Sequence, residues 1–143
     1  MGEGIVVQVV VVVLVAAGAA LLLARRVART RKTLGQQGLA HRDSWDEMMI
    51  KRLRAEGYHP FNEYRVDFFL ALRDETTCES VRARLAPEGF AVDVKPIADQ
   101  SDLTFSLHAS KSMRLIVPDI QALSRRMGAL AEEFQGRYDH WVA

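Results

Sequence analysis

Four histidines and one cysteine are the side chains of this sequence with the most obvious capacity for chemistry. The histidines share no local spacing, and a zinc site would need them or nearby carboxylates to converge in space; they are His41, His59, His108 and His140. We interpret them as solvated or hydrogen-bonded side chains and expect no metal ion and no cofactor. Cys78 is the single cysteine, so the chain can form no internal disulfide, which agrees with a reducing compartment. We expect it to be a small core residue.

Patterns of the common enzyme classes do not appear either. Ser, His and Asp are all present, but no nucleophile elbow accompanies them. Gly35 and Gly38 enclose two glutamines, and this segment lacks the lysine, strand and helix of a phosphate-binding loop. The sequence therefore indicates a protein that is not an enzyme and has no small-molecule substrate.

The most apolar stretch, residues 5–24, contains one amide and no charge. At about 1.5 Å rise per residue it is long enough to cross a bilayer core as a helix. A cleaved secretory signal is the alternative. Against it, no Lys or Arg precedes the apolar run, and the run exceeds the usual apolar region of about 7–15 residues. We predict a single transmembrane helix over 5–24.

The charges beside this stretch predict its direction, because Lys- and Arg-rich flanks remain cytoplasmic. Glu3 is the only ionisable side chain ahead of the stretch, whereas five cations follow it: Arg25, Arg26, Arg29, Arg31 and Lys32. We predict a short exterior N-terminus (1–4), a basic collar and linker (25–42) that meets anionic lipid head groups, and a cytoplasmic domain (43–143). The expected location is a bacterial-type inner membrane.

The segment beyond the linker is mildly acidic. From Ala40 onward fourteen Lys and Arg stand against seventeen Asp and Glu, a net charge of −3. A protein that grips nucleic acid by its phosphates normally has a strongly basic surface. Nucleic acid is therefore an unlikely partner for this domain.

The periodicity of apolar residues predicts the elements of the domain. A helix should start at Ser44, which forms a capping box with Glu47, and end at Gly57. Its apolar stripe (Trp45, Met49, Leu53) could pack on the domain or lie against the bilayer, and we favour packing on the domain.

A strand follows over 64–72, with Val66, Phe68, Leu70 and Leu72 on one face. A second helix, capped by Thr76 and Glu79, should bury Cys78, Val81 and Leu85. Strands over 90–94 and 103–110 come next. Pro118 should open the last helix, whose inward stripe is Ile120, Leu123, Met127, Leu130, Ala131 and Phe134. Gly136 should end it before a strand over 138–142. The order β-α-β-β-α-β predicts an α+β fold of the ferredoxin-like kind, with two helices on one face of an antiparallel sheet.

Several short motifs resemble those of one family. They are Asp67–Leu72 (DFFLAL), Glu88-Gly89-Phe90, Leu130-Ala131, Phe134, Gly136 and the ending Tyr138-Asp139-x-Trp141. With this order of elements the sequence resembles the ribonuclease E inhibitor family, regulator of ribonuclease activity B, over about residues 64–141. Two departures stand out: His140 replaces the usual glycine, and the transmembrane stretch is foreign to that family. The resemblance implies a non-catalytic protein that inhibits a ribonuclease by protein–protein contact.

The candidate partner-binding residues are Tyr138, Asp139, Trp141 and Phe69. In one interpretation Tyr138 and Trp141 close the edge of the core while Asp139 caps a backbone turn. In the other, the aromatic side chains are exposed anchors for a protein partner, since Trp and Tyr are frequent interface hot spots. Phe69 is expected on the outer face of the sheet.

A membrane-tethered RNA-binding module is the alternative function, because RNA-recognition motifs share this strand order and stack bases on outer-face aromatics. The third strand, however, offers only Thr104, Ser106 and His108 to that face.

Overall fold

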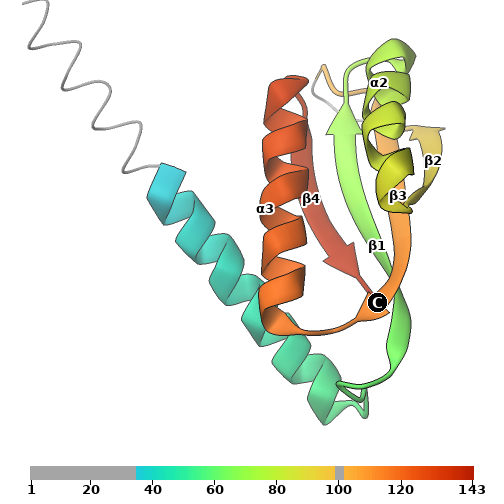
Figure 1. The fold of residues 1–143 in the computed structure, drawn as a ribbon. Coiled ribbons are helices and arrows are strands. Elements are labelled where there is room, and N and C mark those ends of the chain that lie inside the picture. The colour runs from blue at the N-terminus through green and yellow to red at the C-terminus, as the bar shows by residue number, and fades with distance from the viewer. Residues whose placement is uncertain (1–34, 99–101) are drawn as a thin grey trace, which may run out of the picture. The chain divides into compact units, whose positions relative to one another are not determined.

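A four-stranded antiparallel sheet in the order β2-β3-β1-β4 organises residues 42–143 (Figure 1). The computed structural model describes residues 35–98 and 102–143. Its elements are β1 (Glu63–Leu72), α2 (Glu75–Leu85), the 3-10 turn η1 (Ala86–Glu88), β2 (Ala91–Pro96), β3 (Phe105–Arg114), α3 (Val117–Glu133) and β4 (Arg137–Val142). This is an α+β fold with the β-α-β-β-α-β order that the sequence predicts.

Strand β1 lies at the centre of the sheet and pairs antiparallel with two neighbours. It pairs with β3 along its whole length, from Glu63 opposite Arg114 to Leu72 opposite Phe105. On its other side it pairs with β4, with an irregularity in register between Phe69 and Leu70. Strands β1 and β3 are therefore the two inner strands, and β2 and β4 form the edges of the sheet.

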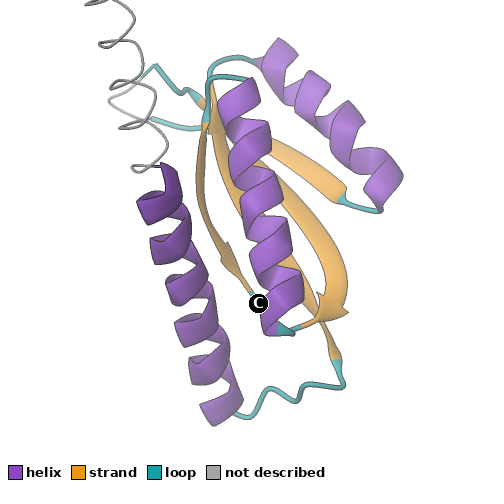
Figure 2. Ribbon diagram, turned by 60° about the vertical axis from the view of Figure 1, so that its left-hand side comes forward, coloured by secondary structure: helices purple, strands orange, loops and turns teal. Residues whose placement is uncertain are grey.

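The two faces of β1 differ as the alternation of its sequence predicts. Val66, Phe68, Leu70 and Leu72 are fully buried beneath the helices. In the part of the chain that the structure describes, α2 and α3 lie on this face and no helix covers the other face (Figures 1 and 2). Burial of the apolar stripes of both helices against one face supplies the main stabilising free energy.

The predicted helix stripes are confirmed. Helix α2 buries Cys78, Val81 and Leu85, and burial raises the pKa of the Cys78 thiol to about 11. This thiol is therefore protonated at neutral pH and behaves as a core residue. The buried residues of α3 include Ile120, Met127, Leu130 and Ala131, while Leu123 and Phe134 pack partly buried against the core.

The two predicted helix caps are wrong. Residues 35–55 are helical, so Ser44 lies inside a helix, and the described part of the predicted linker, residues 35–42, is helical as well. Leu39, Ala40 and the glutamines of this segment are good helix formers, which outweighs its glycines. Helix α2 is capped by Asp74, whose extended backbone lets its carboxylate accept a hydrogen bond from the Thr77 amide at 2.7 Å. Thr76 lies within the helix instead.

The third predicted strand also has different bounds. It runs over Phe105–Arg114 rather than 103–110, because β1 offers pairing partners as far as Glu63.

Residues 42–55 pack on the domain, which is the alternative that we favour for this helix. Ile50 and Leu53 are buried in the core, and Trp45 and Met49 lie partly buried against it.

The predicted transmembrane helix (5–24) and its flanking cations, Arg25 to Lys32, lie outside the described residues. Within 35–98 and 102–143, no helix has both the length and the apolar character needed to span a bilayer.

Candidate functional site

Two of the four candidate partner-binding side chains belong to the core. Trp141 is fully buried and Tyr138 is nearly so. The Trp141 indole lies edge-on to Trp45, with ring centroids 5.8 Å apart, and its Nε1 donates to Asp46 Oδ1 at 2.8 Å. The Tyr138 hydroxyl lies 3.3 Å from the Ser124 hydroxyl. Tyr138 and Trp141 therefore close the core, as the first of the two interpretations holds, and are not exposed anchors.

The partner of Trp141 is a buried carboxylate, Asp46, that the motifs of the sequence do not single out. Asp46 has no exposed surface, and its Oδ2 has no hydrogen-bond partner in the described part of the chain. Burial raises the pKa of Asp46, and contacts with Trp141 and Ser124 offset part of that rise. Its position offered a signal, since Asp46, Ile50 and Leu53 share one helical face, and a polar residue on a buried face marks a specific contact.

The stability of the protein is expected to depend on the ionisation of Asp46. Burial raises the pKa of Asp46 in the folded protein, so ionising this carboxylate lowers the free energy of unfolding. The loss is absent below the ordinary pKa of an aspartate, near 4, and grows as the pH rises through the raised pKa of the folded protein. Asp46→Asn keeps an oxygen for Trp141 but cannot ionise. The stability of the wild type relative to Asp46→Asn should therefore fall between pH 4 and neutral pH. Urea denaturation of both proteins across this range measures the difference between their free energies of unfolding. A difference that does not change with pH would contradict the expected role of Asp46 ionisation.

The outer face of the sheet carries a row of three rings. His108 on β3 and His140 on β4 are the register partners of Phe69 on β1. The Phe69 and His108 centroids are 4.4 Å apart with the rings inclined at 63°, while His140 stacks on Phe69 at 5.0 Å and 16°. We name Phe69, His108 and His140 the ring row. It is the main aromatic feature of the open sheet face, and sequence spacing alone did not indicate it.

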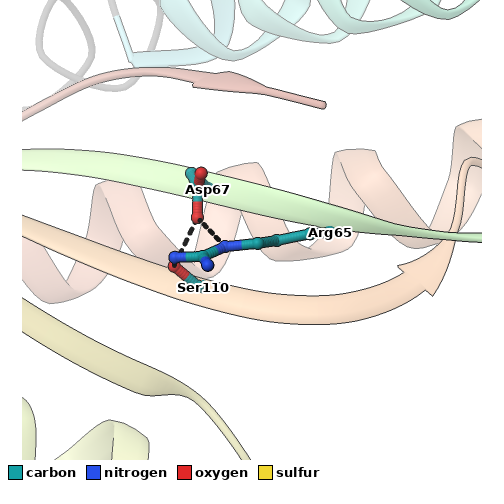
Figure 3. A network of polar contacts seen from close by, with 3 residues as sticks. All are labelled: Arg65, Asp67 and Ser110. Carbon is teal, nitrogen blue, oxygen red and sulfur yellow. Dashed lines mark hydrogen bonds and ion pairs between the residues drawn. The ribbon is translucent and has the colours of Figure 1, made fainter.

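A polar network lies next to the ring row on the same face. Asp67 accepts hydrogen bonds from the Ser110 hydroxyl and from Arg65 Nε, the latter at 3.1 Å, and Arg65 Nη2 donates to Ser110 at 3.0 Å (Figure 3). Burial opposes the ionisation of Asp67, but these donors outweigh it and hold its pKa below the usual range. The outer face is thus a mixture of aromatic, cationic and anionic groups.

Asp139, the fourth candidate, is exposed on β4. Its carboxylate accepts from Arg137 Nε on the same strand, whereas the first of the two interpretations assigned it to capping a backbone turn. Of the four candidates, Phe69 and Asp139 therefore reach the surface, and Tyr138 and Trp141 fix the strand that carries Asp139 and His140.

The arrangement of these groups bears on the chemistry that the surface can perform. The ring of Phe69 separates His108 from His140, and the described residues contain no group of three or more His, Cys, Asp or Glu placed to hold a metal ion. Both neighbours of Phe69 in the row are imidazoles, so the row joins one apolar ring to two polar ones.

Comparisons with known proteins give the family. A family model described as regulator of ribonuclease activity B matches residues 44–142. The match includes most of the helix over 35–55, both packed helices and all four strands of the sheet. A search of curated proteins finds no match. Since the family model covers more than half of the sequence and the fold agrees with the order of elements, this chain belongs to the regulator of ribonuclease activity B family.

Proposed function

We propose that this protein is a non-catalytic regulator that binds a ribonuclease and lowers its activity by direct contact. Membership of the regulator of ribonuclease activity B family is the observation that carries the proposal. The partner implied by the resemblance is ribonuclease E. A surface that mixes rings with paired charges supports contact with a protein, because interfaces combine apolar anchors with a polar surround.

We assign the contact to the outer face of the sheet, centred on the ring row, with Asp139 at its edge. Phe69 is partly exposed and held between two imidazoles, so little side-chain freedom remains to be lost on binding. Tyr138 and Trp141 act beneath this surface by holding β4 against the core. Their contribution to binding is therefore through position rather than contact.

The protein is further proposed to act from the membrane. The support is the sequence of residues 5–24, an uncharged span followed by Arg25, Arg26, Arg29, Arg31 and Lys32. In this arrangement residues 43–143 lie in the cytoplasm of a bacterial-type cell, within reach of a ribonuclease and of anionic head groups.

The membrane location predicts two results. Membranes washed with carbonate should retain the chain, and protease added from the cytoplasmic side should remove the domain.

The functional proposal predicts measurable inhibition. Full-length protein in detergent, mixed with ribonuclease E and an RNA substrate, should slow cleavage, and Phe69→Ala should weaken this effect about 10-fold. Because Phe69 lies on the open face, the melting temperature should change little.

Met48→Ala is the matched control, since Met48 is an exposed apolar side chain on the helix over 35–55. Unchanged cleavage with wild-type protein would refute the regulatory role. Retention of the RNA without ribonuclease, falling steeply as salt increases, would favour the RNA-binding alternative.

A further inference from the structure

Strand β2 leaves one edge of the sheet without a partner strand. In the order β2-β3-β1-β4 it is an outermost strand, and among the described residues only β3 pairs with it (Figure 1). An open edge strand presents backbone N–H and C=O groups with which a further strand can pair. The free edge of β2 is therefore a place where a strand of another molecule can join the sheet.

The register of β2 with β3 identifies which backbone groups point outward. Ile97, directly after β2, donates its amide to the Thr104 carbonyl at 2.8 Å, which makes these two residues a hydrogen-bonded pair of the ladder. Hydrogen-bonded and non-hydrogen-bonded pairs alternate along an antiparallel ladder. Val92, Val94 and Pro96 therefore direct their backbone groups away from β3. Proline fits this position because its missing N–H costs no bond to β3.

The side chains of β2 differ between the two faces of the sheet. Val92 and Val94 face the helix layer but are only partly buried, whereas Val66 in the central strand is fully buried. Asp93 and Lys95 are exposed on the outer face, where their charged groups lie 3.5 Å apart. The edge thus combines a half-covered apolar stripe with one anion and one cation.

The side chains beside the middle of β2 add little net charge. Ser106, His108 and Ser110 of β3 lie opposite β2 on the outer face, so His108 is the one ionisable group among them. Glu79 and Arg82 of α2, a helix that contacts β2, pair with each other at 3.4 Å. Asp93 and Lys95 are therefore the charges that a strand at this edge would meet first.

Two cations lie near the start of β2. Arg65 and Lys111 line a hollow beside Ala91. Arg65 is paired with Asp67 at 3.1 Å, and Lys111 donates to the Glu88 carbonyl at 2.7 Å. Two copies of this edge avoid repulsion between these cations only if their starts lie apart, as they do when the strands run antiparallel.

We propose that β2 pairs antiparallel with β2 of a second copy of this chain, about a two-fold axis at Val94. Such an interface uses the same patch on both copies. The Val94 amides donate reciprocally to the Val94 carbonyls, and each Val92 amide donates to the Pro96 carbonyl of the other copy. Asp93 of each copy lies opposite Lys95 of the other on the outer face, and the two Val94 side chains meet on the helix face.

The order of the charges selects this register. The outward-facing residues must pair with one another, so the alternatives place the axis at another residue of β2. An axis at Asp93 puts the two aspartates opposite each other, and an axis at Lys95 does the same with the lysines; like charges directly opposite are destabilising. An axis at Val92 or Pro96 loses the pairing of Asp93 with Lys95 and shortens the overlap. In the proposed register the two copies of Ala91 lie about 20 Å apart.

The same residues favour a second copy over an unrelated strand. Lysine and proline commonly protect an edge strand from pairing. A second copy of β2 places Asp93 opposite Lys95, and it uses Pro96 only as an acceptor. Because the axis is perpendicular to the sheet, the outer faces of both copies, with their ring rows, lie on the same side of one continuous sheet. The inference does not depend on the proposed function.

Cysteine crosslinking of full-length protein in detergent tests the register. Asp93 and Lys95 would form a non-hydrogen-bonded pair with Cα atoms about 4.5 Å apart, within the limit of about 7 Å for a disulfide. A mixture of Asp93→Cys and Lys95→Cys proteins should therefore form a disulfide-linked dimer on oxidation, and its other Asp93–Lys95 pair stays intact. Cys78 is buried with its pKa raised to about 11, so it should not compete.

Either cysteine variant alone should not crosslink, because its two cysteines would lie two residues out of register. Crosslinking of Asp93→Cys alone to the same extent as the mixture, or no crosslinking of the mixture, would overturn the inference.

Charge exchange tests the reason for the pairing. Asp93→Lys or Lys95→Asp places like charges opposite each other and should weaken dimerisation about 10-fold, measured by sedimentation of full-length protein in density-matched detergent. The double variant Asp93→Lys/Lys95→Asp restores opposite charges and should dimerise like the wild type. Glu47→Lys makes the same change of charge at an exposed position of the helix over 35–55 and is the control.

Equal melting temperatures of these variants would show that the fold is unchanged. A dimer that the single exchanges leave unaffected, or that the double exchange fails to restore, would contradict pairing through β2. A wild-type chain that remains monomeric at every concentration would also overturn the inference, while inhibition of the ribonuclease would be unaffected by that result.

Discussion

Replacing Trp141 with alanine is expected to destabilise the protein by about 3–5 kcal/mol, as for other fully buried aromatic side chains. The change removes the largest buried side chain, its edge-on contact with Trp45 and the donor to Asp46. Asp46 would then remain buried without its principal hydrogen-bond donor, which adds a desolvation cost. Urea denaturation of the full-length protein, followed by circular dichroism, measures the loss.

Trp141→Phe separates packing from hydrogen bonding. Phenylalanine keeps a ring in the core but has no N–H for Asp46, so the expected loss is smaller, about 1–3 kcal/mol. It should also grow with pH, because the ionised carboxylate needs the donor more than the neutral acid does. If Trp141→Ala unfolded at the wild-type urea concentration, the assignment of Trp141 to the core would be wrong.

Gly136→Ala is expected to cost about 1–3 kcal/mol through overpacking. A Cβ at this position would lie 2.5 Å from the Ala71 carbonyl oxygen and 2.6 Å from Leu72 Cδ2. The carbonyl belongs to the central strand β1 and cannot move without disturbing its pairing with β4. The glycine is thus required for close approach. The left-handed backbone that ends α3 is at Gln135 instead, with a φ of 57°.

Gly38→Ala is the control for this substitution. Gly38 lies in the helix over 35–55, and nothing lies within 4 Å of the Cβ that alanine would add. Alanine is the better helix former, so no loss of stability is expected. Equal stability of Gly136→Ala and wild type in thermal unfolding would show that β1 and the start of β4 can separate without cost.

The pattern of apolar residues predicted the regular parts of the fold. Alternation along β1 and the stripe from Ile120 to Phe134 each leave one face to bury, and the structure buries it. The starts of helices were harder to predict. Asp74 and Thr76 are both capable caps, and Ser44 fits a capping box although the preceding residues continue the helix. Local chemistry allowed several starts, and neither Ser44 nor Thr76 is the residue at which a helix begins.

The candidate site was only partly predictable for a different reason. The ring row depends on the register of three strands, and His108 and His140 lie far from Phe69 in the sequence. Sequence spacing cannot report such a register. Asp46 was missed because a charged residue on an amphipathic helix usually faces water, and its hydrogen-bond donor, the indole of Trp141, lies 95 residues away in the sequence.

The central position of β1 also has a kinetic consequence. Its two neighbours, β3 and β4, come from much later in the chain: Phe68 pairs with Ala109 on one side and with Trp141 on the other. Long loops must close before either pairing can stabilise anything, which slows folding relative to proteins dominated by local contacts. One edge of strand β1 therefore remains unpaired until β4, the last strand, has been synthesised. During that interval the nascent chain is most exposed to aggregation and most dependent on chaperones.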